Sequence, residues 1–229
     1  MDNIPIIIAG SRLWNRIQIE GMIDELPMPV CGVSNRSELD KALSEEPGIR
    51  FIFFLHWSFT VPKRITENYH CICFHMTNVP YGRGGSPLQN LIQRGHRETI
   101  LSALKMVTEV DAGPVYLKRP LSLEGGTAEE IYIRAAELSC EMIQEILERN
   151  LQPIAQEGEV VEFKRRKSEN SVLPVDAPLD VIHDHIRMLD AEGYPHAFLE
   201  VGGIRLEFTR SARYAENLLA DVRITRKLD

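Results

Sequence analysis

The chain has 229 residues, 44% of them hydrophobic and 26% charged, which is the composition of an ordinary folded protein and excludes a disordered or collagen-like one. Its 33 acidic residues outnumber its 26 lysines and arginines, giving a formal net charge of −7. Because phosphate contacts need clustered cations, this balance disfavours nucleic acid and a polybasic membrane attachment. No run approaches the roughly 20 apolar residues that span a bilayer, and the acidic start lacks a signal peptide's basic region. We therefore expect a cytoplasmic protein without a membrane partner.

Apolar runs in the first third of the chain predict buried strands. They lie at residues 4–8, 29–33, 50–55 and 70–74. Helices are expected between the first three, over residues 14–25 and 35–46, and Asn35 with Glu38 three residues later marks the start of the second. Alternation of strands and helices predicts an α/β fold, with a Rossmann-like, mostly parallel sheet and flanking helices.

Two capping boxes predict helices further along the chain, Ser86 with Gln89 and Thr127 with Glu130. The second of these helices has apolar residues every three or four positions and ends near Asn150. Between the two helices, another strand is expected over residues 99–107.

The composition changes after Pro153, and this change defines the predicted domains. We expect a catalytic domain at 1–155, a polar and partly basic linker at 156–175, and a small helix-and-strands subdomain at 176–229. The subdomain is predicted to contain one helix and three strands, at residues 178–190, 197–201, 204–209 and 219–226. Gly202-Gly203 predicts a tight hairpin turn between the first two strands.

The four cysteines do not form a metal-binding motif. Cys71 and Cys73 are separated by one residue, whereas zinc and redox motifs separate such a pair by two. We expect no metal, and reduced, mostly buried thiols.

Candidate chemistry lies after the fourth predicted strand. His75 directly follows that strand, at the edge of the sheet where ligands bind in α/β folds. Asp111 follows the next strand, and a carboxylate there can orient the imidazole. The alternatives are a core histidine and a turn-capping aspartate, and the spacing alone does not choose between them.

This region resembles the 10-formyltetrahydrofolate-dependent formyltransferases. That family has a strand ending Asn-x-His, a proline-containing loop ending Arg-Gly, and an Asp-x-Gly motif some 36 residues later. The matching positions here are His75, Pro80, Arg83, Gly84, Asp111 and Gly113. The resemblance continues through Phe163–Arg166 into 186–198, which is similar to the C-terminal subdomain of the family's sugar-modifying branch.

The resemblance implies transfer of a formyl group from N10-formyltetrahydrofolate to a primary amine. The implied catalytic residues are His75 beside the reacting carbon, Asp111 orienting its ring and moving a proton, and the residue at the family's asparagine position, which here is Cys73. A thiol is a weaker donor to an oxyanion than an amide is. Backbone groups, His75 or Asn78 would then stabilise the oxyanion, or catalysis is slow or lost.

For the folate, the resemblance implies a site between two loops. Its residues would be Phe54, Leu55, Trp57, Arg83, Met106, Val107, Val110 and Asp111. Trp57 is equally compatible with a place in the core.

For the acceptor, we expect a nucleotide-linked amino sugar, suspected to be a UDP-linked 4-amino-4,6-dideoxy sugar of the pseudaminic acid pathway. Methionyl-tRNA is disfavoured by the negative charge balance and by the lack of a large basic C-terminal domain. The predicted substrate-binding residues are Ser11, Arg12, Asn78, Lys164, Arg165 and Arg166. A folate-binding protein with lost catalysis and a formyltetrahydrofolate hydrolase remain as alternatives, and a homo-oligomer is left open.

Overall fold

The structure, a computed structural model, describes residues 4–227 and divides into two compact units. Unit 1 contains the residues up to Gly84, then Ile100–Leu121 and Ile133–Glu162. Unit 2 contains Gly85–Thr99, Ser122–Tyr132 and the residues from Phe163 onward. Each unit collects segments that are far apart in the chain, whereas the sequence predicts domains made of consecutive stretches.

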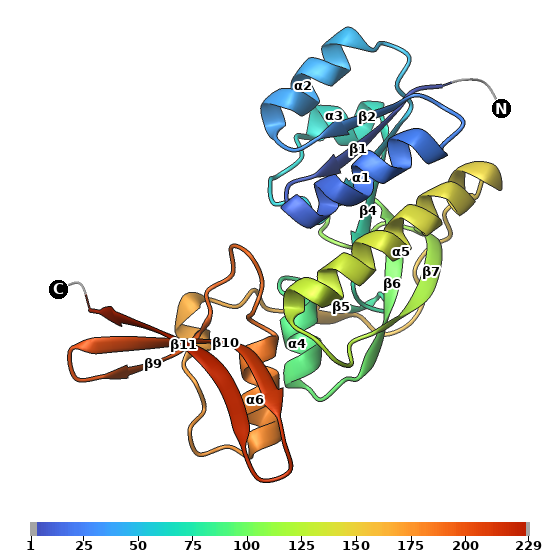
Figure 1. Ribbon diagram of the computed structural model, residues 1–229. Helices are drawn as coiled ribbons and strands as arrows, with labels where there is room; N and C mark the ends of the chain where they lie inside the picture. The colour runs from blue at the N-terminus through green and yellow to red at the C-terminus, as the bar shows by residue number, and fades with distance from the viewer. Residues whose placement is uncertain (1–3, 228–229) are drawn as a thin grey trace. The chain divides into compact units, whose positions relative to one another are not determined.

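Unit 1 is built on a six-stranded sheet in the order β2-β1-β3-β4-β6-β7 (Figure 1). Its strands are β1 (Ile6–Gly10), β2 (Val30–Val33), β3 (Phe51–Leu55), β4 (His70–His75), β6 (Glu98–Lys105) and β7 (Val115–Ser122). β1 pairs in parallel with β2 and β3, β3 in parallel with β4, and β4 antiparallel with β6. The prediction of a mostly parallel sheet is confirmed.

Helices cover both faces of this sheet, as the complete burial of β1 requires. Helices α2 (Arg36–Glu45) and α3 (Lys63–Asn68) contribute Leu39 and Ile65 to a core cluster with Ile7 and Phe54. Helix α1 (Leu13–Glu25) lies beside α5 (Ala128–Glu148), where Gln18 Nε2 donates to Glu137 Oε1 at 3.3 Å (Figure 1).

The helix start predicted at Asn35 and the capping box predicted at Thr127 are confirmed. Asn35 Oδ1 accepts from the Glu38 N–H at 3.0 Å, and the Glu38 carboxylate accepts the Ser34 N–H at 2.7 Å. At the start of α5, Thr127 Oγ1 accepts from the Glu130 N–H at 3.3 Å and Glu130 Oε2 accepts the Thr127 N–H at 2.5 Å.

The capping box predicted at Ser86 is wrong. Ser86 precedes α4 (Pro87–Gln93) in a left-handed conformation, and its hydroxyl accepts from the Arg166 backbone N–H at 3.1 Å. Gln89 is buried and donates to Tyr132 Oη at 2.9 Å and Met188 O at 3.0 Å. Packing contacts from distant parts of unit 2 therefore replace the local cap.

The rest of unit 2 follows the predicted order of one helix and three strands. These are α6 (Leu179–Arg187), β9 (Ala197–Val201), β10 (Ile204–Arg213) and β11 (Leu218–Arg226). β10 is antiparallel to both neighbours, and Val201 pairs with Ile204 across a two-residue turn in which Gly202 has φ +55°. The hairpin prediction is confirmed.

Several short elements are not predicted by the sequence. They are α3, β5 (Tyr81–Gly84), β7, β8 (Val161–Phe163) and the 3-10 helix η1 (Ser168–Ser171). β5 pairs with β8 to form a two-stranded sheet, so residues 156–175 contain regular structure where a linker is expected. Within residues 4–227, no helix combines the length and apolarity needed to cross a membrane.

Candidate functional site

His75 is the last residue of β4, and only 7% of it is exposed. Its Nε2 lies 2.8 Å from Gly82 O. A carbonyl oxygen only accepts hydrogen bonds, so Nε2 carries a proton and donates it to this bond. The other ring nitrogen, Nδ1, faces a carboxylate.

That carboxylate belongs to Asp111, in the turn between β6 and β7. Its Oδ2 lies 3.5 Å from His75 Nδ1 and accepts a hydrogen bond from the Gly84 N–H at 2.9 Å. A carboxylate at this distance can orient the imidazole ring and accept a proton from a reacting group. The structure thus brings together the two residues expected to act in catalysis.

The loop after His75 is fixed by hydrogen bonds from two other strands. Ser102 Oγ, on β6, donates to Thr77 O at 2.7 Å. Lys118 Nζ, on β7, donates to Asn78 Oδ1 at 2.6 Å and to Val79 O at 2.7 Å, and burial lowers the pKa of Lys118. Asn78 therefore has its amide oxygen occupied by a lysine of the scaffold.

Cys73 lies on β4, two residues before His75, and packs against a cluster that includes Ile52, Phe54 and Cys71. Burial, with a smaller effect of the Asp111 carboxylate, raises the pKa of the Cys73 thiol to about 12. The group is a neutral thiol at physiological pH, which makes it a weak hydrogen-bond donor and not a thiolate nucleophile.

Arg83 contacts Gln156, a residue that the sequence analysis does not single out. Arg83 Nε and Nη2 both donate to Gln156 Oε1, at 3.1 and 2.8 Å. Gln156 Nε2 donates to the backbone oxygens of Asp111 and Gly113, at 2.7 Å each. No family motif or regular element marks Gln156, so the sequence gives no signal for it.

The residues expected to bind folate fall into three groups. The side chains of Phe54 and Leu55 are buried in the core, so a contact of these two residues with folate would have to use their backbone groups. Trp57 and Met106 are half-buried against the same apolar cluster as Phe54. Val107 and Val110 are exposed; Val110 has 69% of its surface accessible.

The residues expected to bind the acceptor lie in both units. In unit 1, Ser11 Oγ donates to His56 O at 3.0 Å, and the buried Arg12 Nε has no hydrogen-bond partner among residues 4–227. In unit 2, Lys164 and Arg165 are exposed.

Arg166 differs from these two neighbours. Its guanidinium donates to Gln93 Oε1 at 2.5 Å and to Asn170 O, and burial lowers its pKa. These contacts hold the Arg166 side chain against other residues of unit 2.

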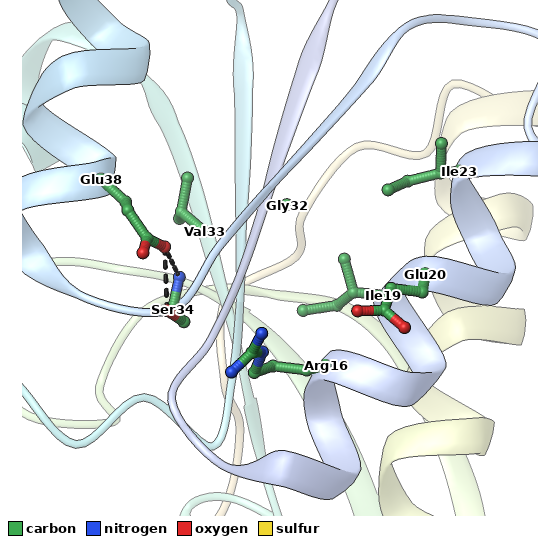
Figure 2. Close-up of a pocket in the computed structure, with 8 residues that line it drawn as sticks. All are labelled: Arg16, Ile19, Glu20, Ile23, Gly32, Val33, Ser34 and Glu38. Carbon is green, nitrogen blue, oxygen red and sulfur yellow. Dashed lines mark hydrogen bonds between the residues drawn. The ribbon is translucent and has the colours of Figure 1, made fainter.

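Unit 1 also contains a cavity of about 230 Å³ between α1 and the end of β2 (Figure 2). Its lining residues are Arg16, Ile19, Glu20, Ile23, Gly32, Val33, Ser34 and Glu38. The Glu38 carboxylate that faces it is already bound to the Ser34 backbone and hydroxyl. None of the predicted site residues lines this cavity, and we assign it no part in the chemistry at His75.

Comparison with known proteins identifies the family. A solved structure, methionyl-tRNA formyltransferase from Clostridium thermocellum, is 43% identical to this chain with a TM-score of 0.93, covering 98% of this chain and 100% of that one. The chain belongs to the formyltransferase family. The predicted family is thereby confirmed, and with it the prediction of an enzyme of the formyltransferase class.

Other formyltransferase relatives match parts of the chain. A family model, the C-terminal domain of methionyl-tRNA formyltransferase, matches residues 168–225. The curated methionyl-tRNA formyltransferase of Sinorhizobium medicae is 29% identical over 188 residues, and the match spans 78% of this chain and 60% of that protein. The structure of HypX from Aquifex aeolicus in complex with tetrahydrofolic acid is 16% identical to this chain, with a TM-score of 0.77. The match covers 94% of this chain and 39% of that one, and it shows a shared fold.

These relatives correct two predictions. The expected acceptor, a nucleotide-linked amino sugar, is contradicted, because the relative at 43% identity and the curated relatives are methionyl-tRNA formyltransferases. The expectation of no nucleic-acid partner is wrong for the same reason. The net charge of −7 misled because it sums over the whole chain, whereas phosphate binding depends on local clusters of cations.

Proposed function

We propose that the protein transfers a formyl group from 10-formyltetrahydrofolate to the amino group of methionyl-tRNA. The observation that carries the reaction type is the contact of buried His75 with the half-buried Asp111 carboxylate, 3.5 Å apart at the end of β4. The acceptor is inferred from the names of the relatives. The match to this chain spans 60% or less of the length of each curated relative cited here.

In this proposal the amine nitrogen attacks the formyl carbon, and the formyl oxygen becomes an oxyanion. The intermediate collapses by breaking the bond between that carbon and N10 of the folate. The amine loses one proton and N10 gains one, so the products are a formamide and tetrahydrofolate. His75 would help to stabilise the developing oxyanion, and the Asp111 carboxylate would accept the proton of the amine.

The folate fits the described residues as a bound co-substrate. Trp57 and Met106 offer half-buried apolar surface on the cluster that also contains Cys73. Cys73 in turn lies two positions before His75 on the same strand. An apolar ring system held there would place its formyl group near the catalytic pair.

An acceptor assay tests the proposal directly. Purified protein is incubated with 10-formyltetrahydrofolate and initiator methionyl-tRNA, and tetrahydrofolate release and formyl-methionine are measured together. We expect equal amounts of both products. His75→Ala and Asp111→Asn should each lower kcat by about 10²–10⁴-fold, because each removes a proton-transfer or charge-stabilising group.

His70→Ala is the matched control, since His70 lies at the other end of β4 and stacks on Phe51. It should keep kcat within a few-fold of the unaltered protein. Formate release without formyl-methionine would instead indicate a hydrolase, and folate binding without turnover would indicate lost catalysis.

A further inference from the structure

We propose that Gln156 is a positioning residue that fixes the Asp111 turn against the Arg83 segment. The inference rests on the proposed function and assigns that site a residue outside its recognised motifs. Both ends of the Gln156 amide are used, the oxygen by Arg83 and the nitrogen by the backbone of Asp111 and Gly113. One side chain thus connects the two segments that bracket the catalytic carboxylate.

The Asp111 turn needs such a constraint because its backbone is unusual. Asp111 has φ +53°, a left-handed conformation that residues other than glycine, asparagine and aspartate rarely adopt. At Gly113 the turn comes so close to β6 that an added Cβ would lie 1.7 Å from Lys105 O. The Gln156 amide satisfies two carbonyl oxygens of this turn at 2.7 Å each, so it stabilises the conformation that aims the carboxylate.

The same amide fixes the residue opposite the carboxylate. Gly84, whose N–H donates to Asp111 Oδ2, directly follows Arg83, whose guanidinium is bound to Gln156 Oε1. A shift of either segment would change the distance from Asp111 Oδ2 to His75 Nδ1, which is 3.5 Å in the structure. Displacements of about 1 Å in a catalytic group cost up to about 10²-fold in rate.

Gln156 itself is placed by an anchored backbone. Two residues earlier, Ile154 exchanges backbone hydrogen bonds with Val115, at 2.7 and 2.9 Å, in an isolated antiparallel bridge to the start of β7. This bridge sets the position from which the Gln156 side chain reaches Asp111.

Three variants separate the two ends of the amide. Gln156→Met removes both sets of hydrogen bonds at similar length. Gln156→Glu keeps the acceptor for Arg83 but replaces the donor that serves the Asp111 turn. Gln152→Met is the matched control, because exposed Gln152 donates only to Asn150 O among the contacts of the described residues.

Steady-state formylation gives the first measurement. We expect Gln156→Met and Gln156→Glu to lower kcat by about 10–10²-fold while KM for methionyl-tRNA changes less than about threefold, because orientation and not binding is lost. Gln152→Met should leave both constants unchanged. The proposal would be overturned if Gln156→Glu kept the kcat of the unaltered protein, or if the two Gln156 variants changed KM and left kcat unchanged.

Hydrogen exchange at the Gly84 amide gives a measurement independent of activity. We expect faster exchange of this amide in both Gln156 variants, at a melting temperature within about 2 °C of the unaltered protein, because its acceptor on Asp111 is no longer held. Unchanged exchange would overturn the proposal even if kcat fell. If the unaltered protein forms no formyl-methionine, the proposed function fails, and the exchange rates still decide whether Gln156 positions the turn.

Discussion

At position 73 the chain carries a thiol where the family pattern has an asparagine. Its pKa, raised to about 12 by burial, shows that the residue is a neutral part of the apolar wall at every physiological pH. In the proposed reaction, stabilisation of the oxyanion then depends on the His75–Asp111 pair, in which Nε2 of the ring is held by Gly82 O.

His56 is expected to make the fold sensitive to mild acid. Burial, with a smaller effect of Arg12, lowers the pKa of His56 from 6.5 to about 4. The unfolded chain therefore takes up the proton first as pH falls, so the contribution of His56 to stability is complete above pH 6.5 and is lost toward pH 4. We expect this residue alone to lower the free energy of unfolding by about 2–3 kcal/mol between pH 7 and pH 4.5.

Urea unfolding at the two pH values measures this effect. The comparison is with His56→Asn, since asparagine tolerates the φ of +47° at this position and does not titrate. Between pH 7 and pH 4.5, the free energy of unfolding of His56→Asn should fall by about 2–3 kcal/mol less than that of the unaltered protein. Equal losses in both proteins would assign the acid sensitivity to other groups.

At the residue scale, the sequence predicts the part of the site that local motifs encode. His75, Arg83 and Asp111 follow a linear pattern, and the structure brings them to one place. Gln156 is not predicted from the sequence, because its proposed role depends on a contact between the loop after Ile154 and a turn 45 residues earlier. Such a contact has no periodicity or fixed spacing in the sequence.

At the scale of elements, hydrophobic runs and caps determine what is predictable. The buried strand β3 and the Asn35 cap have strong local signals and appear where expected, and β1, expected at 4–8, forms at Ile6–Gly10. β5 has the sequence Tyr-Gly-Arg-Gly, in which no apolar pattern exists, and it forms because β8 pairs with it. Ser86 has the sequence of a cap, but tertiary contacts in unit 2 determine its conformation.

The Asn35 cap predicts a measurable contribution to stability. Asn35→Ala removes the acceptor for the Glu38 N–H at the first turn of α2, and we expect a loss of about 1 kcal/mol in the free energy of unfolding. Ser44→Ala, near the end of the same helix, is the control. Among the described residues, the Ser44 hydroxyl donates only to Lys41 O, three residues earlier. Chemical denaturation of both variants checks the difference, and equal stabilities would contradict the assigned cap.

At the scale of the whole molecule, net charge is a poor guide to the acceptor. The chain total is −7, yet Lys164, Arg165 and Lys167 are exposed cations within four consecutive residues. The field near a bound phosphate depends on such neighbours, because charges farther than a Debye length of about 8–10 Å are screened. The fold class, in contrast, follows from patterns spread over the chain and is predicted correctly.

Salt dependence tests whether this cation cluster contacts the acceptor of the proposed reaction. Replacing all three cations by alanine should raise KM for methionyl-tRNA by roughly tenfold. It should also reduce the slope of log(kcat/KM) against log salt by about 2–3, because each cation is expected to make one phosphate contact. Lys41→Ala with Lys63→Ala, two exposed lysines of unit 1, is the control and should leave the slope unchanged. An unaltered slope in the triple variant would exclude the cluster from tRNA binding.

The closeness of Gly113 to Lys105 O has a consequence for how mutational data on this protein are interpreted. A carbon atom at the Cβ position would overlap a backbone oxygen, which no rotamer change relieves, so every other amino acid meets the same obstacle there. In a saturation scan, position 113 would be as intolerant as the catalytic positions. The intolerance of position 113 would reflect backbone geometry. A scan scored by activity alone would therefore class Gly113, which has no side chain, with the residues that take part in the reaction.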